Sequence, residues 1–357
     1  MSATRAADPI ETDVLVVGAG PVGLYQVFQL GLHELRSQLI DSLPMLGGQC
    51  IELYPDKPLY DVPGLPACTG RELIDRLVQQ MRPFATPPHL AQEVEAVEPR
   101  EDGRFRIRSA AGTVFDARAV IVAGGIGSFQ PRRLKIDSLG AYERTQVHYG
   151  IDDPLRLAGQ RVVIVGDGDA ALDAAIALAE DPRAAAGSVT LMHRVDEFKA
   201  DARTVGRWRA LRDAGRARFV AAQPVGFESD AAGRLATLRA ATIDDTTVAL
   251  DVDALLVCTG LSPRLGPLAQ WGLNLERKQI VVDTERFESS VPGIYAVGDI
   301  AAYPGKRKLI VSGFHEATLA AFAAAARVHP DRPQHLEYTT TSPRLKRLLG
   351  VEDPRAA

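Results

Sequence analysis

The chain has 357 residues, a length for which about two domains are expected. Hydrophobic residues make up 46% of the sequence and charged residues 24%, proportions that exclude a disordered or fibrous protein. The formal net charge of −4 argues against a nucleic-acid-binding protein, since such proteins are usually basic. The first twelve residues lack the apolar core of a secretion signal, and no apolar run approaches the roughly 18 residues of a membrane span. We therefore expect a cytoplasmic protein with no nucleic-acid or membrane partner.

The first predicted unit is a strand, a helix and a second strand near the N-terminus. These elements are expected at residues 13–18, 21–30 and 37–41. The turn between strand and helix reads Gly18-Ala-Gly20-Pro-Val-Gly23, which fits the G-x-G-x-x-G pattern of dinucleotide-binding folds. Asp41 ends the second strand, where a carboxylate can accept hydrogen bonds from an adenosine ribose. Because all four parts occur in this order, we favour a dinucleotide site over a chance match.

The same kind of unit occurs again in the middle of the chain. Its strand, alanine-rich helix and second strand are expected at residues 161–166, 169–180 and 188–194. The turn reads Gly166-Asp-Gly168-Asp-Ala-Ala171, with alanine as the third small residue, which the pattern allows. No carboxylate ends the second strand; Arg194 stands there, and Lys199 follows. Positive groups at this place accommodate a 2′-phosphate, which predicts NADP(H) rather than NAD(H). Ordinary solvated surface charges are the alternative interpretation.

Two glycine-rich stretches, at 124–130 and 260–293, mark the expected crossings between two domains. We expect an α/β fold with two Rossmann-like three-layer nucleotide-binding domains, the second inserted into a discontinuous first. The FAD-binding domain would comprise residues 1–122 and 290–357, and the NADP(H)-binding domain residues 123–289. A last alanine-rich helix is expected at 313–328.

Two dinucleotide sites with different ribose chemistry imply electron transfer between two cofactors. No Ser-His-Asp order, H-E-x-x-H pattern or paired-carboxylate motif indicates hydrolysis instead. The three cysteines, Cys50, Cys68 and Cys258, form no C-x-x-C and offer neither a disulfide framework nor a metal site. We expect no metal and no catalytic side chain, because in such enzymes the cofactors perform the chemistry.

Several further motifs resemble those of thioredoxin-reductase-like ferredoxin–NADP reductases, which belong to the FAD-dependent pyridine nucleotide-disulfide oxidoreductase superfamily. The more specific ones are Gly47-Gly-Gln49, Leu53-Tyr-Pro-Asp-Lys57 and Tyr60-Asp-Val-Pro-Gly64. The resemblance continues through His193-Arg194, Gly298-Asp299 and Ser312-Gly-Phe-His-Glu-Ala317, and it covers nearly the whole chain.

This resemblance implies a set of FAD contacts. The set comprises Asp41 at the adenosine ribose, Gln49 and Tyr54 at the ribityl chain and flavin ring, Val94 and Phe129 as adenine-side and flavin-side packing, Asp299 at the ribityl or pyrophosphate region, and Thr340 at the ring. Tyr54 would stack on the flavin, although it and Phe129 could equally be ordinary packing residues. The helix after Gly313 would direct the positive end of its dipole at the flavin.

Three departures from the family pattern affect these expectations. The helix after the second glycine motif has no cysteine pair, unlike that of thioredoxin reductases, so disulfide reduction is disfavoured. Val195 stands where the family often has a second arginine, which weakens the predicted preference for NADP(H). Thr339, preceded by Tyr338, stands where some members place an aromatic residue or histidine over the second flavin face.

The resemblance implies a homodimeric, FAD-dependent reductase that passes a hydride from NADPH to the flavin and then single electrons to ferredoxin, an acidic iron-sulfur protein. A diaphorase or oxidase acting on quinones, flavodoxin or oxygen is one alternative, and a redox sensor that binds both nucleotides is another. Local basic clusters are expected to dock the acidic partner, unless they are only solvated faces. They are Arg132, Arg133 and Lys135; Lys306, Arg307 and Lys308; and Arg344, Lys346 and Arg347.

Overall fold

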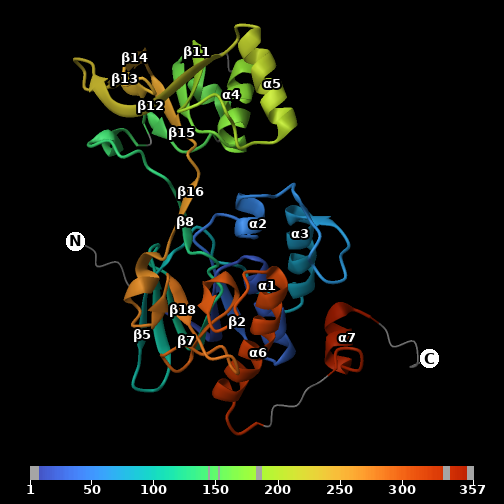
Figure 1. Ribbon diagram of the computed structural model, residues 1–357. Helices are drawn as coiled ribbons and strands as arrows, with labels where there is room; N and C mark the ends of the chain where they lie inside the picture. Colours follow the sequence, from blue (N-terminus) through green and yellow to red (C-terminus); the bar gives the residue numbers. More distant parts are fainter. Residues whose placement is uncertain (1–7, 144, 152, 182–186, 333–337, 352–357) are drawn as a thin grey trace. The chain divides into compact units, whose positions relative to one another are not determined.

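The computed structural model describes residues 8–143, 145–151, 153–181, 187–332 and 338–351, without the side chains of 128–131 and 261–264. The chain divides into two compact units (Figure 1). The first comprises Met1–Ser128 and Pro263–Ala357, and the second is the intervening segment Phe129–Ser262. The second unit is therefore inserted into a discontinuous first one, as the sequence predicts.

The boundaries expected at 122/123 and 289/290 are wrong, because the units divide after Ser128 and after Ser262. The segment 263–289 belongs to the first unit, since Trp271, Ile280 and Phe287 are buried in the core of that unit. Its short strand β18 (Gln279–Val281) also pairs with a strand of the first unit. The glycines of this segment led us to expect a crossing between the domains along its whole length. Its apolar residues instead pack in the core of the first unit.

The first unit is built on a six-stranded sheet in the order β2-β1-β7-β6-β5, with β19 paired to β7. The bounds are β1 Ile10–Val17, β2 Ser37–Ile40, β5 Val94–Pro99, β6 Phe105–Ser109, β7 Val114–Val122 and β19 Ile294–Ala296. β1 runs parallel to both β2 and β7, which is the Rossmann arrangement that brings the carboxyl ends of these strands to one edge. β5 and β6 are antiparallel additions to this sheet.

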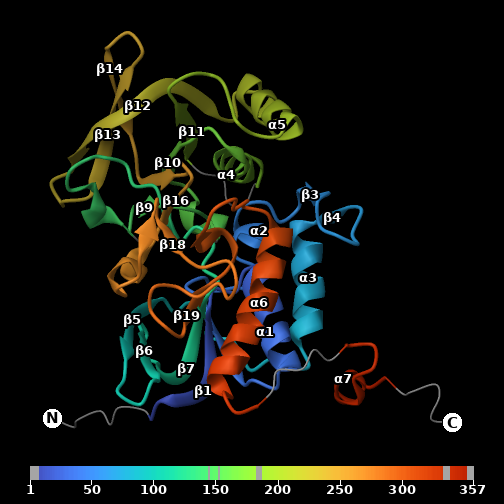
Figure 2. The ribbon, with the colours of Figure 1, turned by 60° about the horizontal axis from the view of Figure 1, so that its bottom comes forward.

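Helices α1 (Pro21–Leu32), α3 (Gly70–Met81) and α6 (Ile310–Val328) lie side by side in the first unit (Figures 1 and 2). α6 buries mainly alanines, including Ala317 and Ala321. Side chains of this size let two helices approach closely, and α6 and α1 are in extensive contact. The N-terminal ends of α1 and α6 are thereby held near each other.

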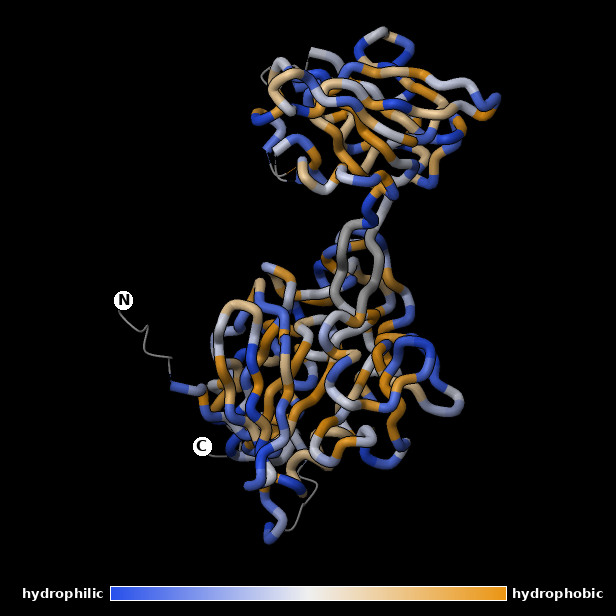
Figure 3. The backbone as a smooth tube through the Cα atoms, turned by 90° about the vertical axis from the view of Figure 1, so that its left-hand side faces the viewer, coloured by the Kyte–Doolittle hydropathy of each residue, from blue (hydrophilic) through white to orange (hydrophobic). Residues whose placement is uncertain are grey.

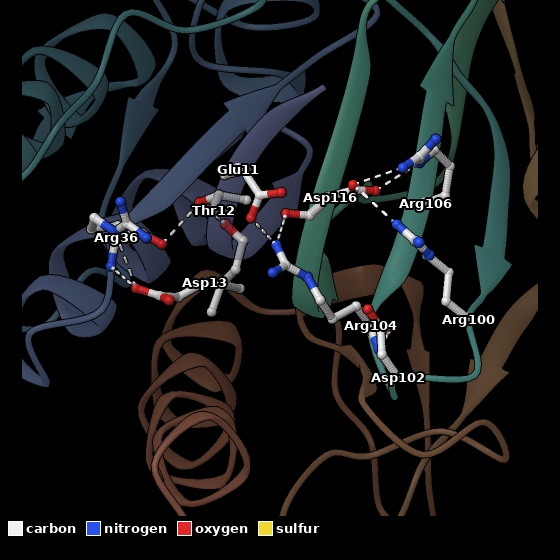
Figure 4. A network of polar contacts seen from close by, with 10 residues as sticks. Glu11, Thr12, Asp13, Arg36, Arg100, Asp102, Arg104, Arg106 and Asp116 are labelled. Carbon is white, nitrogen blue, oxygen red and sulfur yellow. Dashed lines mark hydrogen bonds and ion pairs between the residues drawn. The ribbon is translucent and has the colours of Figure 1, made fainter. Parts of the chain in front are cut away.

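A polar network joins the antiparallel strands to the parallel sheet (Figure 4). Asp116 on β7 is 4% exposed and accepts hydrogen bonds from Nε and Nη2 of Arg106 on β6, at 2.7 and 2.8 Å. Arg104 donates hydrogen bonds to the carboxylate of Glu11 on β1 and to the carbonyl of Asp116. The hydrogen bond from Arg106 is the main reason that the pKa of Asp116 is lowered. The network therefore ties β1, β6 and β7 together.

The second unit contains a seven-stranded sheet in the order β14-β13-β12-β11-β10-β15-β9. The bounds are β9 Val147–His148, β10 Arg161–Val165, β11 Ser188–His193, β12 Arg218–Ser229, β13 Leu235–Thr242, β14 Thr247–Asp251 and β15 Ala254–Val257. The strands from β12 to β9 are parallel, while β13 and β14 extend the sheet as an antiparallel pair. α4 (Asp169–Glu180) packs against β10 and β11, and α5 (Ala202–Asp213) packs against α4.

Hydrophobic residues follow the central strands of each unit (Figure 3). The remaining elements are α2 Gln49–Glu52, α7 Pro343–Leu349, β3 Pro58–Leu59, β4 Cys68–Thr69, β8 Ser128–Pro131, β16 Leu261–Arg264, β17 Leu275–Glu276, β20 Ala301–Ala302 and the 3-10 helices Leu139–Tyr142, Pro154–Leu157, Gly266–Gln270 and Gly298–Ile300. In the part of the chain that the structure describes, no helix combines the length and apolar character needed to cross a membrane.

Candidate nucleotide-binding sites

The three glycines of the first motif have three different surroundings. A Cβ on Gly18, where φ is +110°, would lie 2.4 Å from the carbonyl O of Ala123 at the end of β7. A Cβ on Gly23 would lie 1.8 Å from the carbonyl O of Gly18. A Cβ on Gly20 would have no heavy atom within 4 Å. Gly18 and Gly23 are therefore required by the turn itself, whereas Gly20 leaves open space in which a pyrophosphate can approach the backbone.

The helices of the predicted sites also differ from the other helices at their N-termini. Side chains cap α3, α5 and α7, through Thr69, Asp201 and Ser342. No side-chain hydrogen bond caps α1, α2, α4 or α6, which begin after Gly20, Gly48, Gly168 and Leu309. Uncapped N–H groups and the positive end of the helix dipole together form an anion-binding arrangement. The uncapped helices are those that the sequence places at nucleotides.

Asp41 is fixed by the glycine loop. Its Oδ2 accepts a hydrogen bond from the N–H of Ala19 at 2.5 Å, and its Oδ1 accepts one from the N–H of Leu43 at 2.8 Å. Burial raises the pKa of this carboxyl group, and the two backbone hydrogen bonds oppose that effect. The carbonyl O of Asp41 also accepts a hydrogen bond from the N–H of Gln92 at 2.9 Å. This bond brings Val94, the first residue of β5, close to Asp41. Val94 is 4% exposed.

The Gly-Gly-Gln motif lies against the glycine loop. The N–H of Gly47 donates to the carbonyl O of Ala19 at 2.9 Å, and a Cβ on Gly48 would lie 3.0 Å from Cα of Gly20. A Cβ on Gly125 would lie 2.9 Å from Nε2 of Gln49. Gln49, the first residue of α2, therefore lies against the glycine turn that follows β7. The structure thus brings two motifs that are far apart in sequence to one edge of the sheet.

Tyr54 lies beside a thiol and near Asp299. The Sγ of Cys50 donates a hydrogen bond to the hydroxyl O of Tyr54 at 3.6 Å, and Cys50 is fully buried. Burial is the main cause of the raised pKa of Tyr54, and the hydrogen bond with Cys50 and the charge of Asp299 raise it further. The structure therefore groups the predicted ring-stacking residue with the predicted ribityl-binding residue. Cys50 contributes to this group through its hydrogen bond to Tyr54.

The Gly298-Asp299 turn packs against the beginnings of two helices. A Cβ on Gly298, where φ is +78°, would lie 3.4 Å from Cγ2 of Val22 on α1, and a Cβ on Gly313 would lie 2.4 Å from the same atom. α6 begins at Ile310, three residues before the helix start expected from the sequence. Gly313 is therefore inside the first turn of α6, where only glycine permits the close approach to α1.

Of the remaining predicted FAD residues, Thr340 lies apart from the others and Phe129 has no described side chain. Thr340 is exposed and precedes α7, whose Arg344 donates from Nη1 to the carbonyl O of Gly31 at 3.0 Å. Gly31 is at the C-terminal end of α1, about 15 Å along the helix from the glycine loop. Within one chain, this anchoring does not bring Thr340 to the other predicted FAD residues. Phe129 lies in β8, whose side chains are outside the described part of the structure.

The second glycine loop repeats the arrangement of the first. A Cβ on Gly166 would lie 2.3 Å from the carbonyl O of Cys258, and Ala171 is fully buried beneath the loop. A Cβ on Gly168 would meet only the carbonyl O of Lys199, at 3.9 Å. The middle glycine is thus the open one again. The third small residue, Ala171, packs the helix on the strand, as the motif requires.

The two residues predicted to bind the 2′-phosphate, Arg194 and Lys199, differ in whether their charge is paired. Arg194 directly follows β11, is exposed, and makes no hydrogen bond or ion pair with the residues that the structure describes. Lys199 is also exposed, but its Nζ lies 2.9 Å from Oδ2 of Asp167, and Nε2 of His193 lies 3.7 Å from the same oxygen. Sequence reasoning did not assign Asp167 a role. The available signal was an acidic residue between the two glycines of a phosphate-binding loop.

The prediction that Lys306 belongs to a docking surface is wrong. Lys306 has a side-chain exposure of 8% and is paired with Glu316, which is completely buried on α6. Glu316 was missed as well, although an acid in an otherwise apolar, alanine-rich helix is a recognisable signal. Arg133 is exposed but pairs with Glu143 at 2.9 Å. Arg307 and Lys308 are both exposed.

The paired units, each with a glycine loop opening into an uncapped helix, define a two-domain nucleotide-binding protein of the double-Rossmann class. Residues 12–324 match the family model described as pyridine nucleotide-disulphide oxidoreductase. The chain belongs to this family.

Curated relatives match almost the whole chain. A ferredoxin–NADP reductase from Methylibium petroleiphilum is 54% identical, with 97% of this chain and 94% of the relative covered. One from Polaromonas sp. is 50% identical (99% and 96%), and ferredoxin–NADP reductase 2 from Cupriavidus metallidurans is 51% identical (97% and 93%).

Solved structures of low sequence identity have the same fold. The thioredoxin reductase of T. acidophilum aligns with a TM-score of 0.60 at 22% identity, covering 88% of this chain and 98% of the other. A bacillithiol disulfide reductase from Staphylococcus aureus aligns with a TM-score of 0.62 at 16% identity, covering 89% and 99%.

Proposed function

We propose that this chain is an FAD-dependent ferredoxin–NADP(+) reductase. The observation that supports it most is the duplicated glycine loop, in which only the middle glycine has open space and the following helix has no side-chain cap. Two such loops in one chain provide for two dinucleotides. The names of the relatives at 50–54% identity supply the reaction.

The first unit would hold FAD. Asp41, Val94, Gln49, Tyr54 and Asp299 would contact it in the order adenosine, ribityl chain and flavin ring. Bound FAD would supply the chemistry, by accepting a hydride from the nicotinamide and releasing electrons singly to the acceptor. The chain itself would orient the cofactor. The uncapped N–H groups of α1 would face the pyrophosphate, and those of α6 would provide a positive end near the ring. Tyr54, held by Cys50, would stack on the flavin.

The second unit would hold NADP(H). Its pyrophosphate would lie over Gly166 and Gly168, and the guanidinium of Arg194 would bind the 2′-phosphate through two parallel N–H bonds. Lys199 would add a weaker positive field, because Asp167 shares its charge. No described cysteine lies on α4, which speaks against disulfide reduction.

The acceptor would be ferredoxin, docked by exposed cations that include Arg307 and Lys308. We propose a cytoplasmic homodimer. Because α7 anchors the tail at the far end of α1, Thr340 would reach the flavin of the partner subunit rather than its own.

The experiment that tests this function measures NADPH oxidation by the purified protein with ferredoxin, flavodoxin, a quinone and oxygen as separate acceptors. Fastest turnover with ferredoxin supports the proposal. Turnover with quinone or oxygen but none with ferredoxin would identify a diaphorase or oxidase instead. Nucleotide binding without turnover on any acceptor would identify a redox sensor.

A further inference from the structure

Helix α6 carries a carboxylate that is completely removed from solvent. Glu316 is 0% exposed, and its Oε2 accepts a hydrogen bond from the backbone N–H of Gly298 at 2.6 Å. Its Oε1 accepts a hydrogen bond from the hydroxyl of Tyr303 at 2.7 Å and one from Nζ of Lys306. Both oxygens are therefore satisfied, and the negative charge is matched by a buried ammonium group.

The cation of this pair is also enclosed. The Lys306 side chain is 8% exposed, and Nζ lies 5.4 Å from the centre of the Tyr303 ring. The bond to Glu316 is the main cause, after burial, of the raised pKa of Tyr303, so its hydroxyl remains a donor. Three side chains from the loop and helix after the Gly298-Asp299 turn thus form one closed group.

Such a pair is a poor means of stabilising a fold. Removing two ions from water is costly, and apolar residues of similar volume often replace buried ion pairs without loss of stability. An apolar residue at position 316, however, could not accept the hydrogen bond that the N–H of Gly298 donates to Glu316. That hydrogen bond fixes a glycine with φ of +78° directly before Asp299.

The hydrogen bond between Gly298 and Glu316 lies close to the first glycine loop. Gly298 packs on Val22, which lies beside Gly23 of the first glycine loop, and Gly313 in the first turn of α6 packs on Val22 as well. The Glu316 bond therefore joins the Asp299 turn to the helix that begins beside it. The glycine loop, the turn and the start of α6 are the three parts to which the proposed FAD site is assigned.

We propose that Glu316 and Lys306 are positioning residues of the flavin site: the carboxylate holds the Gly298-Asp299 turn against α6, and the ammonium keeps the net charge beside the flavin near zero. This inference rests on the proposed FAD-dependent function. It assigns no proton transfer and no substrate contact to either residue.

The test compares the parent with Glu316→Gln, Lys306→Met and the double variant, using the full chain loaded with FAD. Dissociation of FAD is followed by its fluorescence, and the two-electron midpoint potential by dye-coupled titration at pH 7. Each single variant leaves one buried charge unpaired, so we expect the Kd for FAD to rise about tenfold or more. The midpoint potential should shift upward in Glu316→Gln, which leaves a positive charge, and downward in Lys306→Met, which leaves a negative one. The double variant should return toward the parent.

Glu98→Gln is the matched control, because Glu98 forms an exposed ion pair with Arg108 in the same unit. It should leave both readouts unchanged. If Glu316→Gln does not fold, Tyr303→Phe removes one hydrogen bond to the same carboxylate and should weaken FAD binding by a smaller factor. Parent-like Kd and potential in the Lys306 and Tyr303 variants would overturn the inference. So would midpoint potentials that shift in the same direction in Glu316→Gln and Lys306→Met. A parent that does not bind FAD would overturn the proposed function instead.

Discussion

The ammonium group of Lys199 lies 2.9 Å from the carboxylate of Asp167, which stands between Gly166 and Gly168 in the second glycine loop. His193 approaches the same carboxylate, with Nε2 at 3.7 Å. A phosphate bound near Lys199 would therefore meet a cation whose charge is already shared. Arg194 directly follows His193 and has no partner among the described residues, so its charge at the end of β11 is not shared.

The first prediction concerns the preference for NADPH over NADH. Arg194→Ala should lower kcat/KM for NADPH more than tenfold and leave kcat/KM for NADH almost unchanged. The size follows from the loss of a charged hydrogen bond, which is worth about 1.5 to 3 kcal/mol. Lys199→Ala should have a smaller effect. Arg209→Ala, an exposed arginine on α5, is the control and should change neither cofactor. If kcat/KM fell equally for both cofactors in Arg194→Ala, this residue would not be the one that recognises the 2′-phosphate.

The second prediction concerns the first glycine loop. Gly20→Val should yield a folded but colourless protein, because the added side chain fills the open space above Gly20 without meeting protein atoms at Cβ. Gly206→Val is the control, since a Cβ there also meets nothing within 4 Å but lies on α5. The measurements are bound FAD by absorbance and folding by circular dichroism. A yellow, fully loaded Gly20→Val protein would contradict the placement of the pyrophosphate.

The third prediction is that no thiol takes part in turnover. Burial raises the pKa of Cys50, of Cys68 and, to about 11, of Cys258, so none is a thiolate at neutral pH. A variant with serine at all three positions should keep ferredoxin-linked activity. Serine at position 50 can still donate to Tyr54. Loss of turnover with FAD still bound would assign a thiol a role.

The fourth prediction concerns docking. Charge reversal at Arg307 and Lys308 should raise KM for ferredoxin and flatten the dependence of the rate on salt, because steering by exposed charges is screened. Lys306 is left in place, since it is buried. Reversal of the exposed residues Arg209 and Arg277 together is the control, because it changes the net charge by the same amount. Turnover with ferredoxin that is insensitive to salt in the parent would remove the proposed docking surface.

The fifth prediction concerns stability against acid. The lowered pKa of Asp116 means that its ion pair stabilises the folded state above the ordinary pKa of aspartate, and that this stability is lost as the pH falls through the lowered value. Asp116→Asn should reduce Tm by roughly 2 to 4 °C at pH 7. The difference from the parent should shrink as the pH is lowered below 4. A difference that is the same at pH 7 and pH 3 would show that the charge of Asp116 is not the cause.

The sequence predicts the parts of this fold that depend on local patterns. Both strand, turn and helix units follow from short apolar runs that end in glycine, and their positions agree with β1, α1, β10 and α4. The domain boundary at Pro263 could not be predicted from glycine content, because the choice of core depends on distant packing of Trp271 and Phe287.

The same limit applies to side-chain pairing. Lys306, Arg307 and Lys308 are equivalent in sequence, yet only Lys306 turns inward, because Glu316 lies ten residues further on along a helix that folds back beside it. The pairing of Asp167 with Lys199 likewise requires the loop after β11 to return to the glycine turn, as the N–H of Lys199 does in donating to the carbonyl O of Asp167 at 2.7 Å.

The most direct test of the account is an anaerobic titration of the purified, FAD-loaded protein with NADPH, followed by addition of oxidised ferredoxin. We expect the absorbance of the oxidised flavin to disappear with about one equivalent of NADPH, since one hydride carries two electrons. It should reappear within the turnover time when ferredoxin is added. With NADH in place of NADPH, the initial loss of absorbance should be slower. A flavin that NADPH does not bleach, or a bleached flavin that ferredoxin leaves unchanged, would contradict the assignment of this chain as a ferredoxin–NADP reductase.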